Sequence, residues 1–201
     1  MKPRLGGDAY QVTFLNWETA LHLLFVCTGN ICRSPTAERL ALRSGAELSI
    51  PNFAVSSAGT RAVIGHPIHA DAARVLERLG GDASAFAARQ LTARIAAPAD
   101  LIVTMTRAHR DAVLELAPSK LHHTFMLAEV ARLVSACGAV TIADLSRLRS
   151  HLVGSDVADV PDPMGHGAEA YEMAGSLIVE LLPPVMALFA RTSRCAGGNE
   201  R

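Results

Sequence analysis

The sequence predicts an α/β fold in which helices cover both faces of a parallel sheet. Short, continuous apolar runs recur along the chain, and such runs are typical of strands that are buried on both faces. A stretch with helical periodicity follows each of them, and this alternation indicates parallel strands that are joined by helices. In folds of this class, ligands bind beyond the carboxyl ends of the strands.

The first half of the chain contains two strand–helix units. The run 21–26 (LHLLFV) predicts the first buried strand, and 34–45 (SPTAERLALRSG) predicts a helix. Pro35 suits the first turn of that helix, where its missing N–H costs nothing. The second strand is predicted at 53–59 (FAVSSAG), and a helix over 69–81 (HADAARVLERLGG) follows it and ends at a pair of glycines.

The second half continues the alternation. A strand is predicted at 99–106 (ADLIVTMT) and a helix at 107–116 (RAHRDAVLEL), which Pro118 ends. The segment 122–127 (HHTFML) is a candidate fourth strand, and 128–134 (AEVARLV) is helical.

The pattern weakens from about 136 to 160, where we predict an insertion with a helix in TIADLSRLRSHL. A long amphipathic helix is predicted over 165–182, and we expect Pro183 and Pro184 to break or kink it. These elements predict one domain over 20–191, preceded by an N-terminal extension (1–19) and followed by a C-terminal tail (192–201).

Composition narrows the classes of protein that remain. The 19 basic and 19 acidic residues cancel, so no global field attracts nucleic acid or an anionic membrane. The most apolar run, SLIVELLPPVMALFA, is shorter than the roughly twenty residues of a membrane span, and residues 1–20 lack the apolar core of a signal peptide. Four cysteines are too few for a disulfide scaffold, and we therefore expect a protein of the reducing cytoplasm.

The segment 27–34 (CTGNICRS) connects the first strand to the first helix and has the chemistry of an oxyanion site. Gly29 permits a left-handed backbone and Asn30 tolerates one, so successive N–H groups can turn inward around an anion. The first turn of the helix adds free N–H groups, and Arg33 can grip two oxygens of a tetrahedral anion.

The same positive field favours the thiolate of Cys27, and a thiolate beneath a bound phosphate is an activated nucleophile. Ser34 is placed to hydrogen-bond that thiolate. A buried cysteine at a strand end is the alternative, and the C-x5-R spacing alone is weak evidence against it. The buried strand before the segment and the Ser-Pro helix start after it favour the phosphate site. The motifs of other phosphate-binding loops are absent at this position.

The segment VCTGNICRSPTAE (26–38) resembles the signature of the low-molecular-weight protein tyrosine phosphatases. The likeness extends through four further segments: SSAGT (56–60), GGDASAFAARQLT (80–92), DLIVTMTRAHRDAV (100–113) and DPMGHGAEAYEMA (162–174). The resemblance implies a flavodoxin-like, three-layer fold with a four-stranded parallel sheet. It also implies a two-step phosphomonoesterase that acts on phosphoproteins and needs neither a metal nor another cofactor.

By position, the resemblance assigns a role to five residues. Cys27 matches the nucleophile that becomes phosphocysteine, and Arg33 matches the clamp on the phosphate oxygens. Asn30 matches the residue that holds the loop in its strained shape, Ser34 the partner of the thiolate, and Asp162 the general acid. The remaining loop residues complete the phosphate-binding segment: Thr28, Gly29, Ile31 and Cys32.

The acid role also makes chemical sense from the residues. One carboxyl group can protonate the leaving oxygen and then deprotonate the attacking water. Pro163 keeps Asp162 out of a helix, in a loop before a helix start. The residues alone do not separate Asp162 from Asp156 or Asp159, and the choice rests on the resemblance.

The chain departs from the family pattern at three places. Phe86 stands where the family usually has a histidine that supports the loop asparagine, so another group satisfies Asn30 or the loop is less rigid. Met164 and His166 occupy the region where many members carry two aromatic residues. Relatives that dephosphorylate arginine usually have threonine where Ile31 stands, which favours tyrosine as the substrate here.

Other cysteines and histidines give weaker signals. In relatives with a second loop cysteine, the equivalent of Cys32 forms a reversible disulfide with the nucleophile; the alternative is a small buried hydrophobe. We expect ordinary packing or tail positions for Cys137 and Cys195. No spacing typical of a metal site surrounds the histidines, so no metal is expected.

The sequence thus favours a protein tyrosine phosphatase. A protein arginine phosphatase and a thiol-dependent arsenate reductase remain alternatives, because the same loop can hold the phosphoryl group of phosphoarginine or arsenate. A phosphate-binding module without enzymatic activity is the third alternative.

Overall fold

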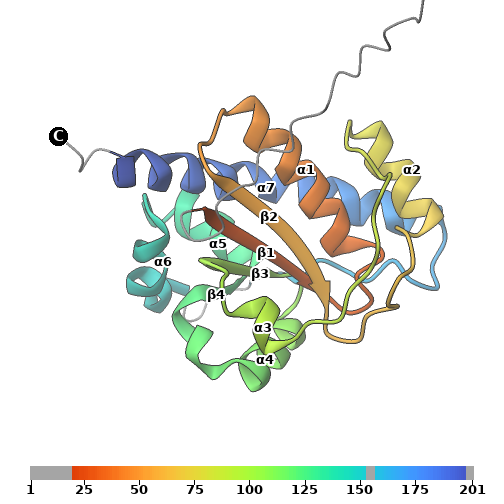
Figure 1. Ribbon diagram of the computed structural model, residues 1–201, viewed down its shortest axis with the longest axis horizontal. Helices are drawn as coiled ribbons and strands as arrows, with labels where there is room; N and C mark the ends of the chain where they lie inside the picture. The colour runs from red at the N-terminus through yellow and green to blue at the C-terminus, as the bar shows by residue number, and fades with distance from the viewer. Residues whose placement is uncertain (1–19, 153–156, 198–201) are drawn as a thin grey trace, which may run out of the picture.

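The computed structural model describes residues 20–152 and 157–197, with the backbone only for 195–197. It contains one four-stranded parallel sheet with the strand order β2-β1-β3-β4 (Figure 1). The strands are β1 (Leu21–Cys27), β2 (Phe53–Gly59), β3 (Leu101–Thr104) and β4 (Thr124–Met126). The α/β fold with a four-stranded parallel sheet is therefore confirmed. The predicted extension 1–19 and Asp156 lie outside the described residues.

Helices cover both faces of the sheet (Figure 1). One core joins alternate residues of β1, such as Leu23 and Phe25, to one set of helices, and the other core joins Leu24 and Val26 to a second set. The period of two in a strand produces this division. The first set comprises α1 (Arg33–Glu47), α2 (Ala70–Arg78), α5 (Leu127–Ser135), α6 (Ile142–Leu148) and α7 (Ala168–Gly197); the second comprises α3 (Ala93–Ala96) and α4 (Arg107–Leu116).

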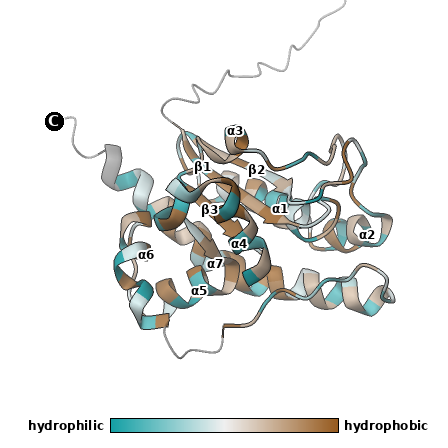
Figure 2. Cartoon of the chain, turned by 90° about the horizontal axis from the view of Figure 1, so that it is seen from below, coloured by the Kyte–Doolittle hydropathy of each residue, from teal (hydrophilic) through white to brown (hydrophobic). Residues whose placement is uncertain are grey.

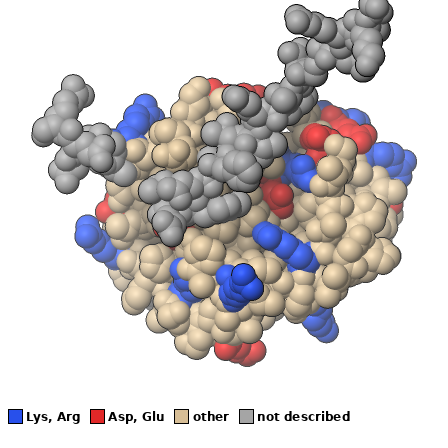
Figure 3. Space-filling view, viewed as in Figure 1, with Lys and Arg blue, Asp and Glu red and all other residues tan. Residues whose placement is uncertain are grey.

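The interior of the molecule is more hydrophobic than its surface. The strands at the centre of Figure 2 are largely hydrophobic, and hydrophilic residues mark the outer helices. Acidic and basic side chains are both scattered over the face in Figure 3, consistent with the cancelling charges of the sequence.

Several element boundaries differ from the sequence-based expectation. A 3₁₀ segment, Pro118–His123, occupies the start of the predicted fourth strand, which begins only at Thr124. Helix α3 is too short for a periodic signal and was not predicted. The weak region contains the expected helix as α6, followed by a 3₁₀ turn at Arg149–Leu152.

Of the two effects expected of the proline pair, a break is wrong, because α7 continues through Pro183 and Pro184 to Gly197. A kink stays a prediction. The two carbonyl groups that lose their N–H partners belong to Val179 and Glu180, which are both exposed and therefore open to water. The helix also extends beyond residue 191, where we predict that the tail begins.

By length and composition, α7 passes the test for a membrane span over Ala168–Arg194, and it is the one helix among the described residues that does. Its apolar residues nevertheless serve the core of the domain. Ile178, Val185 and Phe189 are fully buried, and the helix packs against α1 and α5. A long core helix of a folded domain has these same properties.

Candidate active site

The 27–34 loop lies at the carboxyl end of β1, in the middle of the sheet (Figure 1). Cys27 ends β1 and Arg33 begins α1, so the loop is the whole connection between them. The N–H groups of the first turn of α1 have no partner within the helix, and the positive end of the helix dipole adds to them. This edge of the sheet therefore suits an oxyanion.

Cys27 and Ser34 are in direct contact. The Cys27 sulfur lies 2.9 Å from the hydroxyl oxygen of Ser34, and both side chains are buried. Asn30 donates an amide hydrogen to that same oxygen, also at 2.9 Å. Because the oxygen accepts from Asn30, its own hydrogen is available to the sulfur. Ser34 is thus placed to donate to a Cys27 thiolate.

Asn30 is the strained residue of the loop. Its φ of 55° lies in the left-handed region, whereas Gly29 does not adopt a positive φ. Its side chain is fully buried and compensates for the strain with three bonds. The amide nitrogen donates to Ser34 and, at 2.7 Å, to Ser57, and the amide oxygen accepts from the backbone N–H of Arg89 at 2.9 Å.

The network continues from Ser57 to a buried carboxylate. The Ser57 hydroxyl donates to Glu38 Oε2 at 2.5 Å. Burial raises the pKa of the Glu38 carboxyl, and the hydrogen bond from Ser57 opposes that shift. With Glu38 ionised, every link from Glu38 to the Cys27 sulfur has a donor and an acceptor.

This network shows which groups hold Asn30 in a chain that has Phe86 where the family usually has a histidine. The partners of Asn30 are Ser34, Ser57 and Arg89, so the loop asparagine is satisfied without a histidine. Phe86 instead packs against Arg39, whose guanidinium carbon lies 5.6 Å from the ring centroid. Of the two expectations for this departure, the structure supports the first, in which other groups hold the loop.

The loop after β2 holds the 27–34 loop from the other side. The backbone N–H groups of Thr60, Arg61 and Val63 donate to the carbonyl oxygens of Cys27, Thr28 and Gly29, respectively, at 2.9–3.0 Å. Gly59 permits this approach, because a Cβ atom there would lie 2.4 Å from the Thr28 carbonyl oxygen. The end of the SSAGT segment and the residues directly after it thus lie against the 27–34 loop.

Arg33 and Asp162 form an ion pair beside the loop. Arg33 is 4% exposed; its Nη2 donates to Asp162 Oδ2 at 2.5 Å and its Nη1 to the Val160 carbonyl oxygen at 3.1 Å. The Arg33 Nε–H is buried and has no acceptor among the described residues, so it is a donor that an oxyanion can use. The Asp162 side chain is 47% exposed and reaches solvent.

The structure separates Asp162 from one of its two competitors. Asp159 accepts the backbone N–H of Arg107 at 2.9 Å and so fixes the start of α4. Asp156 lies outside the described residues. Asp162 is thus the candidate acid that contacts Arg33.

Thr28 connects the loop to a buried histidine. Its hydroxyl oxygen lies 2.8 Å from His109 Nε2, and the Thr106 hydroxyl oxygen lies 2.9 Å from His109 Nδ1. Burial, followed by the charge of Arg33, lowers the pKa of His109 to about 4. The ring is therefore neutral near pH 7 and joins the loop to α4.

This neutral histidine predicts a pH dependence of stability. The unfolded chain binds the proton of His109 at a pKa near ~6.5, whereas the folded protein does so only near 4. The stabilising contribution is thus complete above the unfolded value and is lost as the pH falls from there toward 4. In urea denaturation, we expect His109→Gln to lose more free energy of unfolding at pH 7 than at pH 5.

The matched control is His66→Gln, because the side chain of His66 is exposed. We expect this change to leave the difference between the two pH values close to that of the wild type. An equal loss at both pH values in His109→Gln would contradict the neutral, buried histidine.

The two remaining loop residues face other parts of the molecule. The Ile31 carbonyl oxygen accepts the backbone N–H of His69 at 2.8 Å, which attaches the loop to the start of α2. Cys32 is the N-cap of α1, and its sulfur lies 3.4 Å from the sulfur of Met164. Cys27, Cys32 and Cys137 are free thiols, so the redox role of Cys32 stays a prediction.

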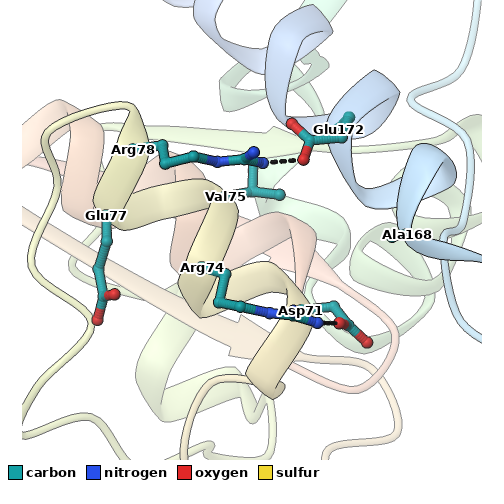
Figure 4. A pocket seen from close by; sticks show the side chains of 7 residues that line it. All are labelled: Asp71, Arg74, Val75, Glu77, Arg78, Ala168 and Glu172. Carbon is teal, nitrogen blue, oxygen red and sulfur yellow. Dashed lines mark hydrogen bonds and ion pairs between the residues drawn. The ribbon is translucent and has the colours of Figure 1, made fainter.

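One cavity lies away from the 27–34 loop. It has a volume of about 610 Å³ and opens between α2 and the start of α7 (Figure 4). Arg74 pairs with Asp71 across one turn of α2, and Arg78 pairs with Glu172 of α7. No residue of the 27–34 loop lines the cavity, and no cysteine, serine or histidine is among its lining residues. Among the side chains that the structure describes, in 20–152 and 157–194, no group of three metal-ligating residues is present.

The structure therefore brings Cys27, Asn30, Arg33, Ser34 and Asp162 together. Sequence reasoning missed four supporting residues that it quoted only within motifs or did not single out: Glu38, Ser57, Arg89 and His109. A polar side chain inside an otherwise apolar strand or helix face was the available signal for Ser57 and Glu38. No local pattern indicates that they pair with Asn30.

Comparison with protein families gives a match that includes the 27–34 loop. Residues 22–144 match the model described as low molecular weight phosphotyrosine protein phosphatase. Asp162 lies beyond the matched residues.

Curated relatives agree with this match. EpsP, a probable low molecular weight protein-tyrosine-phosphatase of Ralstonia nicotianae, is 38% identical over 108 residues, which are 54% of this chain and 71% of that protein. Etp, a low molecular weight protein-tyrosine-phosphatase of Escherichia coli K12, is 38% identical over 107 residues, which are 53% of this chain and 69% of that protein.

Solved structures share the fold over most of the chain. Wzb of Vibrio vulnificus, in complex with benzylphosphonate, has a TM-score of 0.64 at 29% identity, covering 83% of this chain and 97% of its own. The YwlE arginine phosphatase from Geobacillus stearothermophilus has a TM-score of 0.64 at 28% identity, covering 83% of this chain and 90% of its own.

Proposed function

This chain belongs to the low molecular weight phosphotyrosine protein phosphatase family, and we propose that it hydrolyses phosphotyrosine in proteins through a phosphocysteine at Cys27. The observation that carries the proposal is the convergence of Cys27, Ser34, Arg33 and Asp162 at one edge of the sheet. These four side chains supply a nucleophile, a donor to sulfur, an anion clamp and a proton donor.

In the first step, the substrate phosphate binds the N–H groups of the loop and the guanidinium of Arg33. The Cys27 thiolate attacks phosphorus, so that the P–S bond forms as the bond to the tyrosine oxygen breaks. Asp162 gives its proton to that oxygen, and tyrosine leaves as the neutral phenol.

In the second step, the Asp162 carboxylate accepts a proton from a water molecule. The water oxygen attacks phosphorus, and the P–S bond breaks. The thiolate of Cys27 leaves with the hydroxyl hydrogen of Ser34 directed at it, 2.9 Å away. Inorganic phosphate departs, and Asp162 again holds a proton for the next turnover.

The ion pair between Arg33 and Asp162 belongs to this cycle. Arg33 already has a buried Nε–H without an acceptor among the described residues, and it gives up the carboxylate when phosphate oxygens arrive. The exchange releases Asp162 to carry a proton at the leaving oxygen. Binding of the phosphate dianion to Arg33 is thereby coupled to the release of Asp162 for its role as general acid.

Ile31 supports tyrosine as the phosphorylated residue. Side-chain atoms of Ile31 and Val63 lie 3.4–3.8 Å from the position that a Cβ atom on Gly29 would occupy. These two side chains therefore form an apolar edge of the loop. Ile64 beside them is 68% exposed. An apolar edge favours an aromatic ring over a guanidinium group, which requires polar partners. Arginine phosphatase activity is the second candidate, because a solved relative with the same fold has it.

The test compares four substrates with the purified protein: p-nitrophenyl phosphate, a phosphotyrosine peptide, phosphoarginine, and arsenate with a thiol reductant. We expect the highest kcat/KM with the phosphotyrosine peptide. Ile31→Thr is expected to lower the preference for phosphotyrosine over phosphoarginine by about tenfold, the typical loss for one apolar contact.

Each other result has a distinct meaning. Preferential hydrolysis of phosphoarginine would establish the second candidate. Thiol consumption with arsenate but no phosphatase activity would establish a reductase, and binding of phosphate without any turnover would establish a binding module. We propose a cytoplasmic location, because a reducing compartment keeps the nucleophilic thiol free.

A further inference from the structure

Two donors meet at the sulfur of Met164. The Cys32 thiol lies 3.4 Å from this sulfur, and the Tyr171 hydroxyl lies 3.5 Å from it. Met164 follows Asp162 by two residues, and its backbone N–H donates to Asp162 Oδ1 at 3.1 Å. The sulfur is thus attached to the same short segment as the candidate acid.

Both donors are held in place by rigid parts of the site. Cys32 is 5% exposed, and burial, then Cys27, raises the pKa of its thiol to about 12, so it carries its hydrogen at neutral pH. Tyr171 is also 5% exposed, and its ring stacks on His69 with centroids 5.1 Å apart. His69 in turn donates its backbone N–H to Ile31 of the loop.

We propose that Met164 is a positioning residue that keeps Asp162 at the 27–34 loop by accepting hydrogen bonds from Cys32 and Tyr171. The proposal rests on the proposed function. In the described structure, Arg33 also holds the acid segment, through Asp162 and the Val160 carbonyl oxygen. Phosphate competes for the guanidinium of Arg33, whereas the Met164 contacts involve no group that binds phosphate oxygens.

The two attachments therefore act at different stages. Before substrate binds, the ion pair with Arg33 is sufficient to hold the Asp162 carboxylate at the loop. Once the guanidinium binds phosphate, the bonds of Asp159 to Arg107 and of Val160 to Met105 still attach the residues before Asp162. The contacts of the Met164 sulfur attach the residues after it, and so keep the acid near the leaving oxygen. Thiols and thioethers form weak hydrogen bonds, so the effect on rate is modest.

The test measures the ratio of kcat/KM for p-nitrophenyl phosphate, a good leaving group, to that for phenyl phosphate, a poor one. Met164→Leu preserves the apolar volume and removes the acceptor. We expect it to raise this ratio by about threefold to tenfold, as the loss of one or two weak hydrogen bonds implies. Met164→Gln restores an acceptor and is expected to lower the ratio again, toward that of the wild type.

Two further variants separate positioning from packing. Tyr171→Phe keeps the stacked ring and removes the donor, and it is expected to raise the ratio in the same direction. The double variant, Met164→Leu with Tyr171→Phe, should be no worse than Met164→Leu alone, because both changes remove the same contact. The matched control is Met173→Leu, since Met173 is 65% exposed on α7 and should leave the ratio unchanged.

A ratio equal to that of the wild type in Met164→Leu and Tyr171→Phe would overturn the proposal. So would losses that multiply fully in the double variant, since independent effects are additive in free energy. Failure of the proposed function looks different: the wild type itself would then show no phosphatase activity. Should Met164→Leu fail to fold, the ratio in Tyr171→Phe decides by itself.

Discussion

Cys27→Ser is expected to abolish phosphatase turnover. A serine hydroxyl is nearly fully protonated at neutral pH and lacks the nucleophilicity of a thiolate. The surrounding site is built for sulfur, because the Ser34 hydroxyl lies 2.9 Å from it and the positive end of α1 adjoins it. We expect kcat with p-nitrophenyl phosphate to fall by at least ~10⁴-fold, as in other enzymes that lose a covalent nucleophile.

The matched control for this change is Cys137→Ser. Cys137 is a free, partly buried thiol that packs against the main core and lies outside the 27–34 loop. This variant should keep most of the activity. Turnover by Cys27→Ser at a rate near that of the wild type would rule out the covalent mechanism.

Asp162→Asn is expected to slow the reaction by an amount that depends on the leaving group. The amide keeps the size of the carboxyl group but cannot give up a proton, and general acid catalysis typically contributes about 10²- to 10⁴-fold. With phenyl phosphate, we expect a loss in kcat/KM of that order. With p-nitrophenyl phosphate the loss should be much smaller, because the leaving oxygen is stable without a proton.

The measurement is the slope of log kcat/KM against the pKa of the leaving phenol in a series of aryl phosphates. The slope should be steeper in Asp162→Asn than in the wild type. Asp159→Asn is the control, because its amide oxygen can still accept the Arg107 backbone N–H. An Asp162→Asn slope equal to that of the wild type would remove Asp162 from the acid role.

Much of the fold could be predicted from local sequence. The four strands are short apolar runs, and the helices between them, apart from the four-residue α3, have clear periodicity. Their order and type therefore follow from patterns within about twenty residues. The break predicted at the proline pair does not occur, because a helix tolerates proline where the orphaned carbonyl groups face water. Sequence cannot show that Val179 and Glu180 lie on the exposed side.

The residues of the site also fall into those that local sequence predicts and those that it does not. Cys27, Asn30, Arg33 and Ser34 lie within one segment, so spacing indicates them together. Arg33 and Asp162 are 129 positions apart, and their contact depends on how the segment before α7 returns to the end of β1. For the same reason, no local pattern could predict that Ser57 and Arg89 satisfy Asn30 where the family usually uses a histidine.

Trapping of the covalent intermediate tests the proposed mechanism most directly. Asp162→Asn is mixed with p-nitrophenyl phosphate and quenched within the first turnover, and the phosphorylated peptide is located by mass spectrometry. We predict a phosphoryl group on the Cys27 sulfur, formed in step with a burst of p-nitrophenol. Turnover with no phosphoryl group on Cys27, or with one on another side chain, would contradict the phosphocysteine mechanism.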